Sequence, residues 1–330
     1  MNNNKAFTFN DIVLVPDYSD VEHGEINIST KLFEDYSALP ILSSPMDTIS
    51  GYDMLKAFAK VQCWGVHHRY CELDVLNEAS SIGHIAVSPS MGIDNVLKLG
   101  YPKTVFFIDV AHGYTKRNLE FAKELVNAGK NVVSGNIVTP AAMYDYARVG
   151  VRYFRVGIGA GSVCNTRVVT GVGYPQASAV NEIYLAVAAR SALDPEFKII
   201  SDGGHRSTGD IVKALALGAD FVMLGGMLAG TDESLGKKEQ AIWAGHASPP
   251  IFTYRGMASE EALSIRKQEF FVEGVSKNVK AKGSVYVVLK NIENAIKTAC
   301  YYLGVRNLQE LKEVSYQLVT GNSYVEGLPR

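Results

Sequence analysis

A glycine-rich stretch that contains one cysteine has the residue types best suited to chemistry in this sequence. The run GIGAGSVCNTRVVTGVGYPQ, residues 157–176, follows an apolar, β-branched segment and so leaves the end of an expected strand. Three alternate glycines let the backbone turn tightly and approach a ligand without interference from a Cβ atom. Cys164 follows them on a polar loop, and Thr166 lies two residues later. A partly exposed thiol among polar neighbours suits a nucleophile, and the alternative is a small loop residue without chemistry.

Other polar and glycine residues that follow apolar runs could bind a ligand. They are Asp47, Asp109, Asn136, Asp202 and the pairs Gly203–Gly204 and Gly225–Gly226. Backbone N–H groups at glycine turns can hold a phosphate without a lysine, and a carboxylate beside them could accept bonds from ribose hydroxyls. The alternative is that the glycines only form turns. Because two pairs follow adjacent expected strands, the sequence favours a nucleotide monophosphate as ligand.

Eight short apolar runs recur along the chain, and an amphipathic helical stretch follows seven of them. The expected strands are Leu39–Ser43, Trp64–His67, Ile85–Ser88, Val105–Val110, Val132–Ile137, Tyr153–Val156, Ile199–Asp202 and Phe221–Leu224. The helical stretches follow Gly51, Glu72, Gly92, Tyr114, Thr139, Ser178 and Gly209. Alternating strands and helices predict a parallel sheet, and eight such units predict an α/β fold of the (β/α)8 TIM-barrel type. In such a barrel the candidate residues would meet at the carboxyl ends of the strands.

Two segments lie outside this alternation. The first 38 residues form an N-terminal extension, with short strands expected at Asp11–Val15 and Glu25–Ser29. Residues 227–291 separate the eighth strand from a last helix expected at Ile292–Leu303. Such a long connection is usually functional, which predicts a lid or flap insertion after strand eight. We therefore expect a single barrel domain over residues 1–330.

Composition and charge exclude several classes of protein. A net charge of −2 provides no surface for polyanions, so nucleic acid is not expected as a partner. No apolar run reaches about 18 residues, which predicts no membrane span, and the first residues lack a signal-peptide pattern. Cys63, Cys71, Cys164 and Cys300 show no metal-ligand or disulfide spacing. These features predict a reduced, cytoplasmic protein.

Two adjacent histidines, His67 and His68, end the second expected strand. Successive side chains of a regular strand point to opposite faces. The sequence therefore predicts one histidine in the core and one at the barrel mouth, and it argues against a metal held by both.

The cysteine stretch resembles the catalytic-cysteine loop of the IMP dehydrogenase/GMP reductase family. The segments SDGGxxxxGD, FVMLGGMLAG, YRGMAS and EGV, which begin at Ser201, Phe221, Tyr254 and Glu273, are similar to the family's ribose, phosphate, base-site and flap segments. The likeness covers nearly the whole barrel. Ala160 stands where the family usually has proline, Asn165 where it has threonine, and His68 where its reductases tend to have lysine.

The resemblance implies a set of site residues. The implied catalytic residues are Cys164, Thr166 and Glu273. The implied substrate-binding residues are Ser162, Asp202, Gly203, Gly204, Gly225, Gly226, Tyr254, Gly256, Met257 and Ala258. The implied cofactor-binding residues are Asp109, Val110, Ala111, Asn136 and Glu273. The carbonyls of Gly157, Gly159 and Cys164 are implied ligands of a potassium ion.

Both branches of the family form a covalent adduct between the cysteine and C2 of a purine nucleotide. TGVGYPQ and IDVAHGY are similar to the reductase branch, and the residues between Met257 and Glu273 lack the Arg-Tyr pair of the dehydrogenase flap. The chain also has no room near residues 70–85 for the dehydrogenase's inserted regulatory domain of the CBS type. The resemblance therefore implies NADPH-dependent reductive deamination of GMP to IMP by a homotetramer, or an octamer.

Other hypotheses about the function stay open. ILSSPMDT and GVSKNVKAKGSV read more like the dehydrogenase, which would oxidise IMP to XMP with NAD. A non-catalytic purine nucleotide-binding barrel is an alternative of another class, because a fold alone does not determine function. Within the reductase reading, dGMP or a modified guanine nucleotide could replace GMP as substrate.

Overall fold

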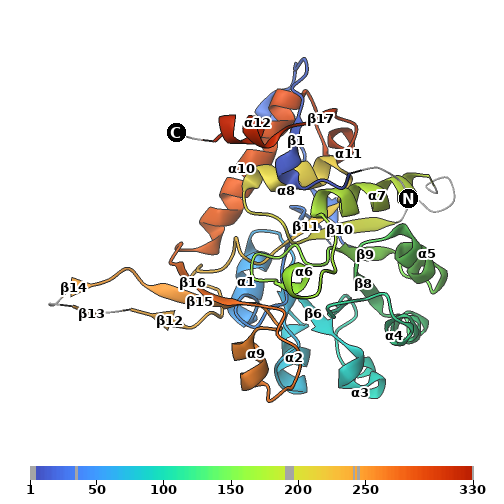
Figure 1. Cartoon of the computed structure of the whole chain (residues 1–330). Helices are drawn as coiled ribbons and strands as arrows, with labels where there is room; N and C mark the ends of the chain where they lie inside the picture. Colours follow the sequence, from blue (N-terminus) through green and yellow to red (C-terminus); the bar gives the residue numbers. More distant parts are fainter. Residues whose placement is uncertain (1–4, 34–35, 190–196, 241, 244–245, 329–330) are drawn as a thin grey trace.

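Eight parallel strands form the central sheet of the protein. The computed structural model describes residues 5–33, 36–189, 197–240, 242–243 and 246–328. The strands are ordered β4, β11, β10, β9, β8, β7, β6 and β5, and a bridge between Leu42 and Trp64 connects the two ends of the sheet into a nearly closed barrel (Figure 1). Their bounds are Ile41–Ser43 (β4), Val66–His67 (β5), His84–Val87 (β6), Val105–Ile108 (β7), Asn131–Ile137 (β8), Tyr153–Val156 (β9), Lys198–Asp202 (β10) and Phe221–Leu224 (β11). All eight predicted strands are confirmed.

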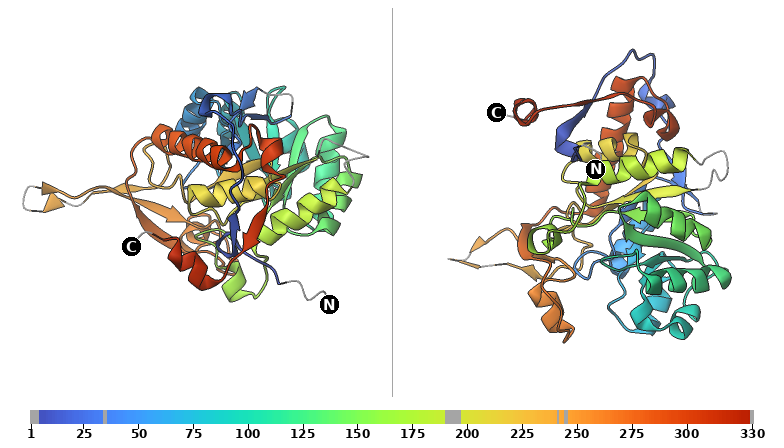
Figure 2. Two further views of the ribbon diagram at one scale, coloured as in Figure 1. Left: turned by 90° about the horizontal axis from the view of Figure 1, so that it is seen from above. Right: turned by 45° about the vertical axis from the view of Figure 1, so that its right-hand side comes forward.

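Helices follow the strands and pack on them from outside the barrel (Figure 2). Their bounds are Tyr52–Lys60 (α1), Leu73–Ala79 (α2), Ile93–Leu97 (α3), Lys116–Asn127 (α4), Pro140–Arg148 (α5), Gln176–Ala188 (α7), Thr208–Ala216 (α8) and Val285–Leu303 (α10). Hydroxyl caps begin four of them: Thr115, Thr139, Ser207 and Ser284 each accept a bond from a backbone N–H of the first turn. Among the described helices, none is both long and apolar enough to cross a membrane.

The strands are buried on both faces, which explains their continuous apolar sequences. In β7, Val105 and Phe107 belong to one hydrophobic cluster, and Phe106 and Ile108 belong to another. The first cluster fills the barrel interior and includes Leu32 from the N-terminal extension. Strands β2 (Thr30–Lys31) and β3 (Ser37–Ala38) pair with each other, and residues of this segment thus pack into the interior cluster of the barrel.

The N-terminal extension is only partly as predicted. A strand at β1 (Ile12–Leu14) is confirmed, and it pairs antiparallel with β17 (Tyr316–Leu318) near the C-terminus. The strand expected at Glu25–Ser29 is wrong, because a 3-10 helix ends at Glu25 and, of the residues that follow up to Ser29, only Asn27 forms an isolated bridge. The Glu25 carboxylate accepts the backbone N–H of Glu22 at 3.1 Å, and this local bond favours a turn over an extended chain. Two short helices, α11 (Leu308–Leu311) and α12 (Gly321–Glu326), lie beside β17 in sequence.

A long excursion follows β11 and projects from the barrel (Figures 1 and 2). It contains a three-stranded antiparallel sheet, a hairpin and a short helix. Their bounds are Lys238–Glu239 (β12), Ile251–Arg255 (β15), Ser276–Lys280 (β16), Ile242–Trp243 (β13), His246–Ala247 (β14) and Glu260–Ile265 (α9). The last helix begins at Val285, earlier than the predicted Ile292, because Val285, Leu289 and Ile292 bury one helical face despite a β-branched start.

Candidate active site

The carboxyl ends of the barrel strands bring the predicted polar residues to one side of the molecule. Asp202 ends β10, Asn136 lies in the last part of β8, and Asp109 directly follows β7. The cysteine loop leaves β9, and the glycine pair Gly225–Gly226 leaves β11. Parallel strands of a closed barrel present these ends to a common mouth. These predicted residues therefore share one end of the barrel, as the sequence analysis expected.

Cys164, Thr166 and Glu273 form a hydrogen-bonded series. The Cys164 Sγ lies 3.2 Å from Thr166 Oγ1, which donates to Glu273 Oε2 at 2.8 Å. Thr166 begins the short helix α6 (Thr166–Val169), so that its side chain returns toward the thiol. Cys164 is partly exposed. A thiol, a hydroxyl and a carboxylate in this order can form a covalent bond and move a proton to or from the reacting group.

The segment just before β16, which includes Glu273 and is called the flap below, is held against the cysteine loop by backbone hydrogen bonds. Asn165 N donates to the Glu273 carbonyl at 2.6 Å, and Val275 N donates to the Val163 carbonyl at 3.0 Å. These two bonds form a bridge between Cys164 and Gly274. The carboxylate of Glu273 is therefore placed by main-chain pairing rather than by a flexible side-chain contact.

A cavity of about 330 Å³ lies beside the cysteine loop. Its lining includes Ser162, Asp202, Gly203, Gly204, Gly225, Gly226 and Tyr254. Gly203 and Gly204 have φ angles of 95° and 82°, a region that residues with a Cβ rarely adopt. The cavity is large enough for a small-molecule ligand and combines glycine backbone with few polar side chains.

Tyr254 and Ser162 meet at one end of this cavity. The Ser162 hydroxyl donates to the Tyr254 hydroxyl at 3.4 Å. Burial raises the pKa of Tyr254 to about 12, so its phenol stays protonated at neutral pH and can donate to an anion. On the outer side, Lys282 Nζ donates to the carbonyls of Gly226 and Met227 at 2.9 and 3.0 Å, which places a cation beside the glycine pair.

Three predicted substrate-binding residues do not line the cavity. Gly256, Met257 and Ala258 pack between the cysteine loop and the flap. A Cβ at Gly256 would lie 2.6 Å from the Val163 carbonyl, so this close approach requires glycine. The Ala258 carbonyl accepts the backbone N–H of Glu273 at 3.0 Å. In this structure the segment anchors the flap.

Asp202 is held by a buried arginine that the sequence analysis missed. Arg155 Nε and Asn136 Nδ2 both donate to Asp202 Oδ2 at 2.8 Å. Arg155 Nη1 also donates to Asp109 Oδ1 at 2.8 Å, and its side chain is 8% exposed. Burial opposes the charge of Arg155, but Asp202 and Asp109 raise its pKa above the usual value. Within the described chain, Asp202 Oδ1 receives no hydrogen bond from a protein donor, which leaves it available to a ligand.

Three of the five predicted cofactor-binding residues follow β7, whereas Asn136 lies in β8 and Glu273 belongs to the thiol series. Asp109 accepts bonds from Arg155 and, at 3.3 Å, from Arg69 Nε. Val110 is half-buried and Ala111 is exposed on the loop that follows. The mouth on this side therefore has a carboxylate already neutralised by two arginines.

Asp47 connects the barrel mouth to the excursion. Its carboxylate lies 3.0 Å from Arg255 Nη2 on β15 and 3.9 Å from Arg266 Nη2 after α9. The guanidinium of Arg266 also stacks 3.9 Å from the centre of the Tyr70 ring. Because both arginines are mostly buried, these contacts hold the excursion against the barrel more firmly than exposed ion pairs would.

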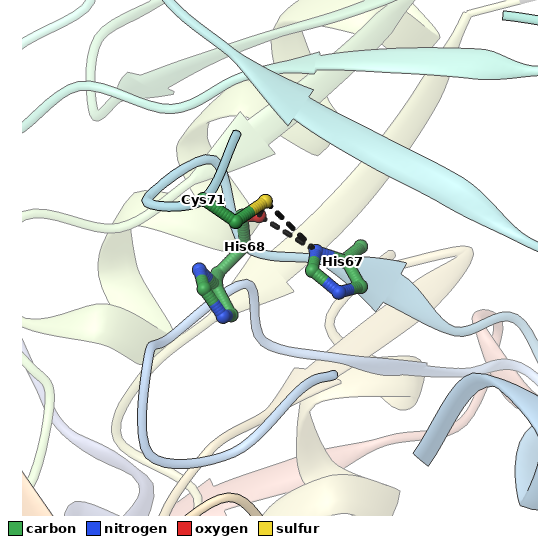
Figure 3. Close-up of side chains that lie close together, drawn as sticks. All are labelled: His67, His68 and Cys71. Carbon is green, nitrogen blue, oxygen red and sulfur yellow. Dashed lines mark hydrogen bonds between the residues drawn. The ribbon is translucent and has the colours of Figure 1, made fainter. Parts of the chain in front are cut away.

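His67 and His68 were predicted to lie one in the core and one at the barrel mouth, and the side-chain alternation on which this prediction rested is not observed. Both side chains are buried, and their rings stack with centres 4.8 Å apart (Figure 3). Strand β5 ends at His67, so the alternation of a regular strand no longer applies to His68. Burial lowers the pKa of His67, and burial together with His67 lowers the pKa of His68 to about 4. Cysteine spacing in the sequence gave no sign that Cys71 belongs to a set of metal ligands. In the structure, Cys71 Sγ lies 3.9 Å from His67 Nδ1.

The barrel and its mouth define an α/β-barrel enzyme with a cysteine and a small-molecule cavity. A sequence model described as "IMP dehydrogenase / GMP reductase domain" matches residues 6–99 and 93–330. The chain is 32% identical to human GMP reductase 2 over 337 residues, which cover 94% of this chain and 93% of the relative. It is 30% identical over 380 residues to inosine-5'-monophosphate dehydrogenase of Cryptosporidium parvum, covering 96% and 92% of the two chains. The chain belongs to the IMP dehydrogenase/GMP reductase family, a family of oxidoreductases.

A GMP reductase of Buchnera aphidicola subsp. Acyrthosiphon pisum (strain Tuc7) is also 32% identical, over 340 residues and 94% of each chain. Reductases and a dehydrogenase are thus similar to this chain to nearly the same degree. Identity alone does not separate the two reactions, so the choice between them must come from the site.

The Asp202 carboxylate provides the first test of ligand binding. We expect Asp202→Asn to weaken nucleotide binding by about 1–3 kcal/mol, because a charged acceptor at the free oxygen is lost. Calorimetry measures this affinity, and thermal unfolding should be followed in parallel because Arg155 loses one of its two carboxylate partners. An unchanged affinity would mean that Asp202 serves only to hold Arg155.

Proposed function

We propose that this chain is a GMP reductase, which converts GMP to IMP with NADPH. The observation that carries the proposal is the Thr166 hydroxyl between Cys164 Sγ and Glu273 Oε2. Reductive deamination needs a nucleophile at C2 of the purine and an acid for the leaving amino group. This series supplies both, and the Thr166 hydroxyl joins them.

The chemistry follows from these three side chains. As the Cys164 sulfur adds to C2 of GMP, the thiol proton passes through Thr166 to Glu273 and the C2–N3 π electrons move to N3. These electrons return when Glu273 gives the proton through Thr166 to the 2-amino group, which leaves as ammonia. NADPH, when bound, supplies the hydride that replaces the amino group at C2. The Cys164 sulfur then leaves with the bonding electrons as thiolate, and IMP is released.

Arg266 supports the choice of the reductase over the dehydrogenase. The dehydrogenase branch of the family hydrolyses its adduct. The resemblance implies that this step uses an Arg-Tyr pair on the dehydrogenase flap. In this chain Arg266 is the arginine between Met257 and Glu273, and its guanidinium donates to the Met257 carbonyl and stacks on Tyr70. Among the contacts of the described residues, none joins Arg266 to Cys164, Thr166 or Glu273, which argues against a role for it in activating water there.

The cavity supports a purine nucleoside monophosphate as ligand. Gly203–Gly204 and Gly225–Gly226 supply backbone N–H groups, and Tyr254 supplies a protonated phenol, which suits a phosphate. Asp202 Oδ1 suits a ribose hydroxyl. The proposed order in the site therefore places the phosphate at the glycine pairs and the base toward Cys164.

Exposed apolar side chains near the thiol series support a place for the nicotinamide. Phe270 and Phe271 on the flap are 70% and 68% exposed, and Val168 on α6 is 81% exposed. Apolar side chains gathered around a polar centre commonly mark a ligand surface. Asp109 and Asn136 lie on the β7–β8 side of the mouth, where we propose that the rest of the cofactor binds.

The carbonyls proposed for a potassium ion fit it unequally. The carbonyl oxygens of Gly159 and Cys164 accept none of the backbone hydrogen bonds formed by the described residues, so they remain available to a cation. The Gly157 carbonyl already accepts from Asn136 Nδ2 at 2.7 Å. We propose that Gly159 and Cys164 are the main ligands of this ion.

We further propose a homotetramer in which the excursion after β11 acts as a lid. Large apolar side chains are exposed around the terminal strand and helices, among them Tyr302, Leu318 and Val325 at 59–62%. Such residues are costly on a monomer when they gather on one face.

A substrate panel tests the proposed reaction. The chain is assayed with GMP, dGMP, IMP and XMP, each with NADPH and with NAD, by the absorbance of the reduced nicotinamide. We expect oxidation of NADPH with GMP and formation of IMP. Reduction of NAD with IMP would instead identify a dehydrogenase, and no turnover with any pair would support the non-catalytic alternative.

A further inference from the structure

Two histidines and a cysteine meet where β5 ends, in a cluster that the proposed reaction does not use. Each of His67, His68 and Cys71 offers one ligand atom, and the three atoms lie within 4.8 Å of one another. Both histidines are buried, and Cys71 is partly exposed. Figure 3 shows the thiol and the His67 ring facing each other across a short gap. Among the described residues, this is the one group of three or more such side chains close enough to hold a metal ion.

The turn after β5 brings the thiol back to the histidines. Cys71 Sγ donates to the His68 carbonyl at 3.7 Å and lies 3.9 Å from His67 Nδ1. Zinc–sulfur and zinc–nitrogen bonds of about 2.3 and 2.0–2.1 Å place the two ligand atoms about 3.6 Å apart in a tetrahedral site. The observed pair therefore needs only a small closing movement to share one ion.

Ion binding would exchange hydrogen bonds for coordination bonds. His67 Nδ1 lies 2.7 Å from the His68 carbonyl, and His68 Nδ1 accepts the backbone N–H of Tyr70 at 3.1 Å. Each of these neutral bonds contributes little net, because water replaces it when it is broken. A transition-metal site of imidazole and thiolate ligands contributes several times more, so the exchange is favourable.

The ligand types select the kind of ion. Imidazole and thiolate together suit zinc and similar borderline or soft ions, whereas calcium and magnesium take oxygen ligands. Three protein ligands leave the fourth position of a tetrahedron open to water. We propose that His67, His68 and Cys71 bind one Zn²⁺ ion at the edge of the barrel mouth. This inference goes beyond the proposed reaction and does not depend on it.

Cobalt provides a direct test because it takes zinc's geometry and shows its ligands by absorbance. The full chain is first freed of metal with a chelator, and Co²⁺ is then titrated in. We expect one equivalent to bind, with the intense visible bands of tetrahedral cobalt and a near-ultraviolet charge-transfer band from a thiolate. Zn²⁺ should displace the Co²⁺ and abolish both.

Substitutions identify which thiol is involved. Cys71→Ser should remove the charge-transfer band and weaken Zn²⁺ binding, measured by competition with a chromophoric chelator, by more than about 10-fold. His67→Gln should weaken binding similarly. Cys164→Ser, which changes the exposed thiol of the candidate active site, should leave the spectrum unchanged. The proposal is overturned if the unaltered chain shows no stoichiometric binding, if the band persists in Cys71→Ser, or if it is lost in Cys164→Ser.

Discussion

Replacing Cys164 by alanine should abolish turnover of GMP while nucleotide binding stays nearly intact. Without the sulfur no covalent bond to C2 can form, and Thr166 and Glu273 have no adduct to protonate. The groups that line the cavity come from other residues and remain in place. We expect kcat to fall by at least about 10³-fold. Calorimetry should show a nucleotide Kd within a few-fold of that of the unaltered chain.

A second thiol deletion controls for the loss of a cysteine in itself. Cys300 is fully buried on α10 and does not line the cavity, so Cys300→Ala should retain most of the activity. Residual steady-state turnover above a few per cent in Cys164→Ala would rule out the nucleophile. A loss of nucleotide binding in the same variant would instead show that Cys164 contributes to the shape of the cavity.

The barrel strands could be predicted because a continuous apolar run identifies them, without any alternation of apolar and polar residues. Each strand is covered on both faces, so a short apolar run bounded by polar or glycine residues suffices to identify it. The excursion gave no comparable signal. β16 reads SKNVK and is mostly exposed, and its pairing with β15 depends on backbone contacts between segments far apart in sequence.

The grouping of Cys164, Thr166 and Glu273 was predicted by resemblance and is present in the geometry. Thr166 and Glu273 are 107 residues apart in the sequence, so residue spacing alone could not have predicted their contact. Arg155 was missed although a charged residue inside the apolar run YFRV was a usable signal, since a buried charge requires a partner. The histidine cluster was missed for a different reason: the rule of alternating side chains was applied one residue beyond the end of a strand.

Glu273→Gln should separate ammonia release from hydride transfer. Glutamine keeps the size of the side chain and can still bond to Thr166, but it cannot deliver a proton. Deamination of GMP should therefore fall by about 10²–10⁴-fold, the usual contribution of a positioned acid. Hydride exchange between IMP and the nicotinamide cofactor releases no ammonia and should stay within a few-fold.

The two half-reactions are measured separately on the same preparation. Deamination is followed by NADPH oxidation with GMP, and exchange by the transfer of deuterium from C2 of labelled IMP to NADP⁺, detected by mass spectrometry. Glu269→Gln is the matched control, because Glu269 is an exposed flap carboxylate without a hydrogen bond to the thiol series. Equal losses in both half-reactions of Glu273→Gln, or no loss in either, would contradict a proton relay through Thr166. Abundant XMP formed from IMP by the unaltered chain would reverse the choice of branch, since Glu273 would then act on hydrolysis of the adduct rather than on departure of the amino group.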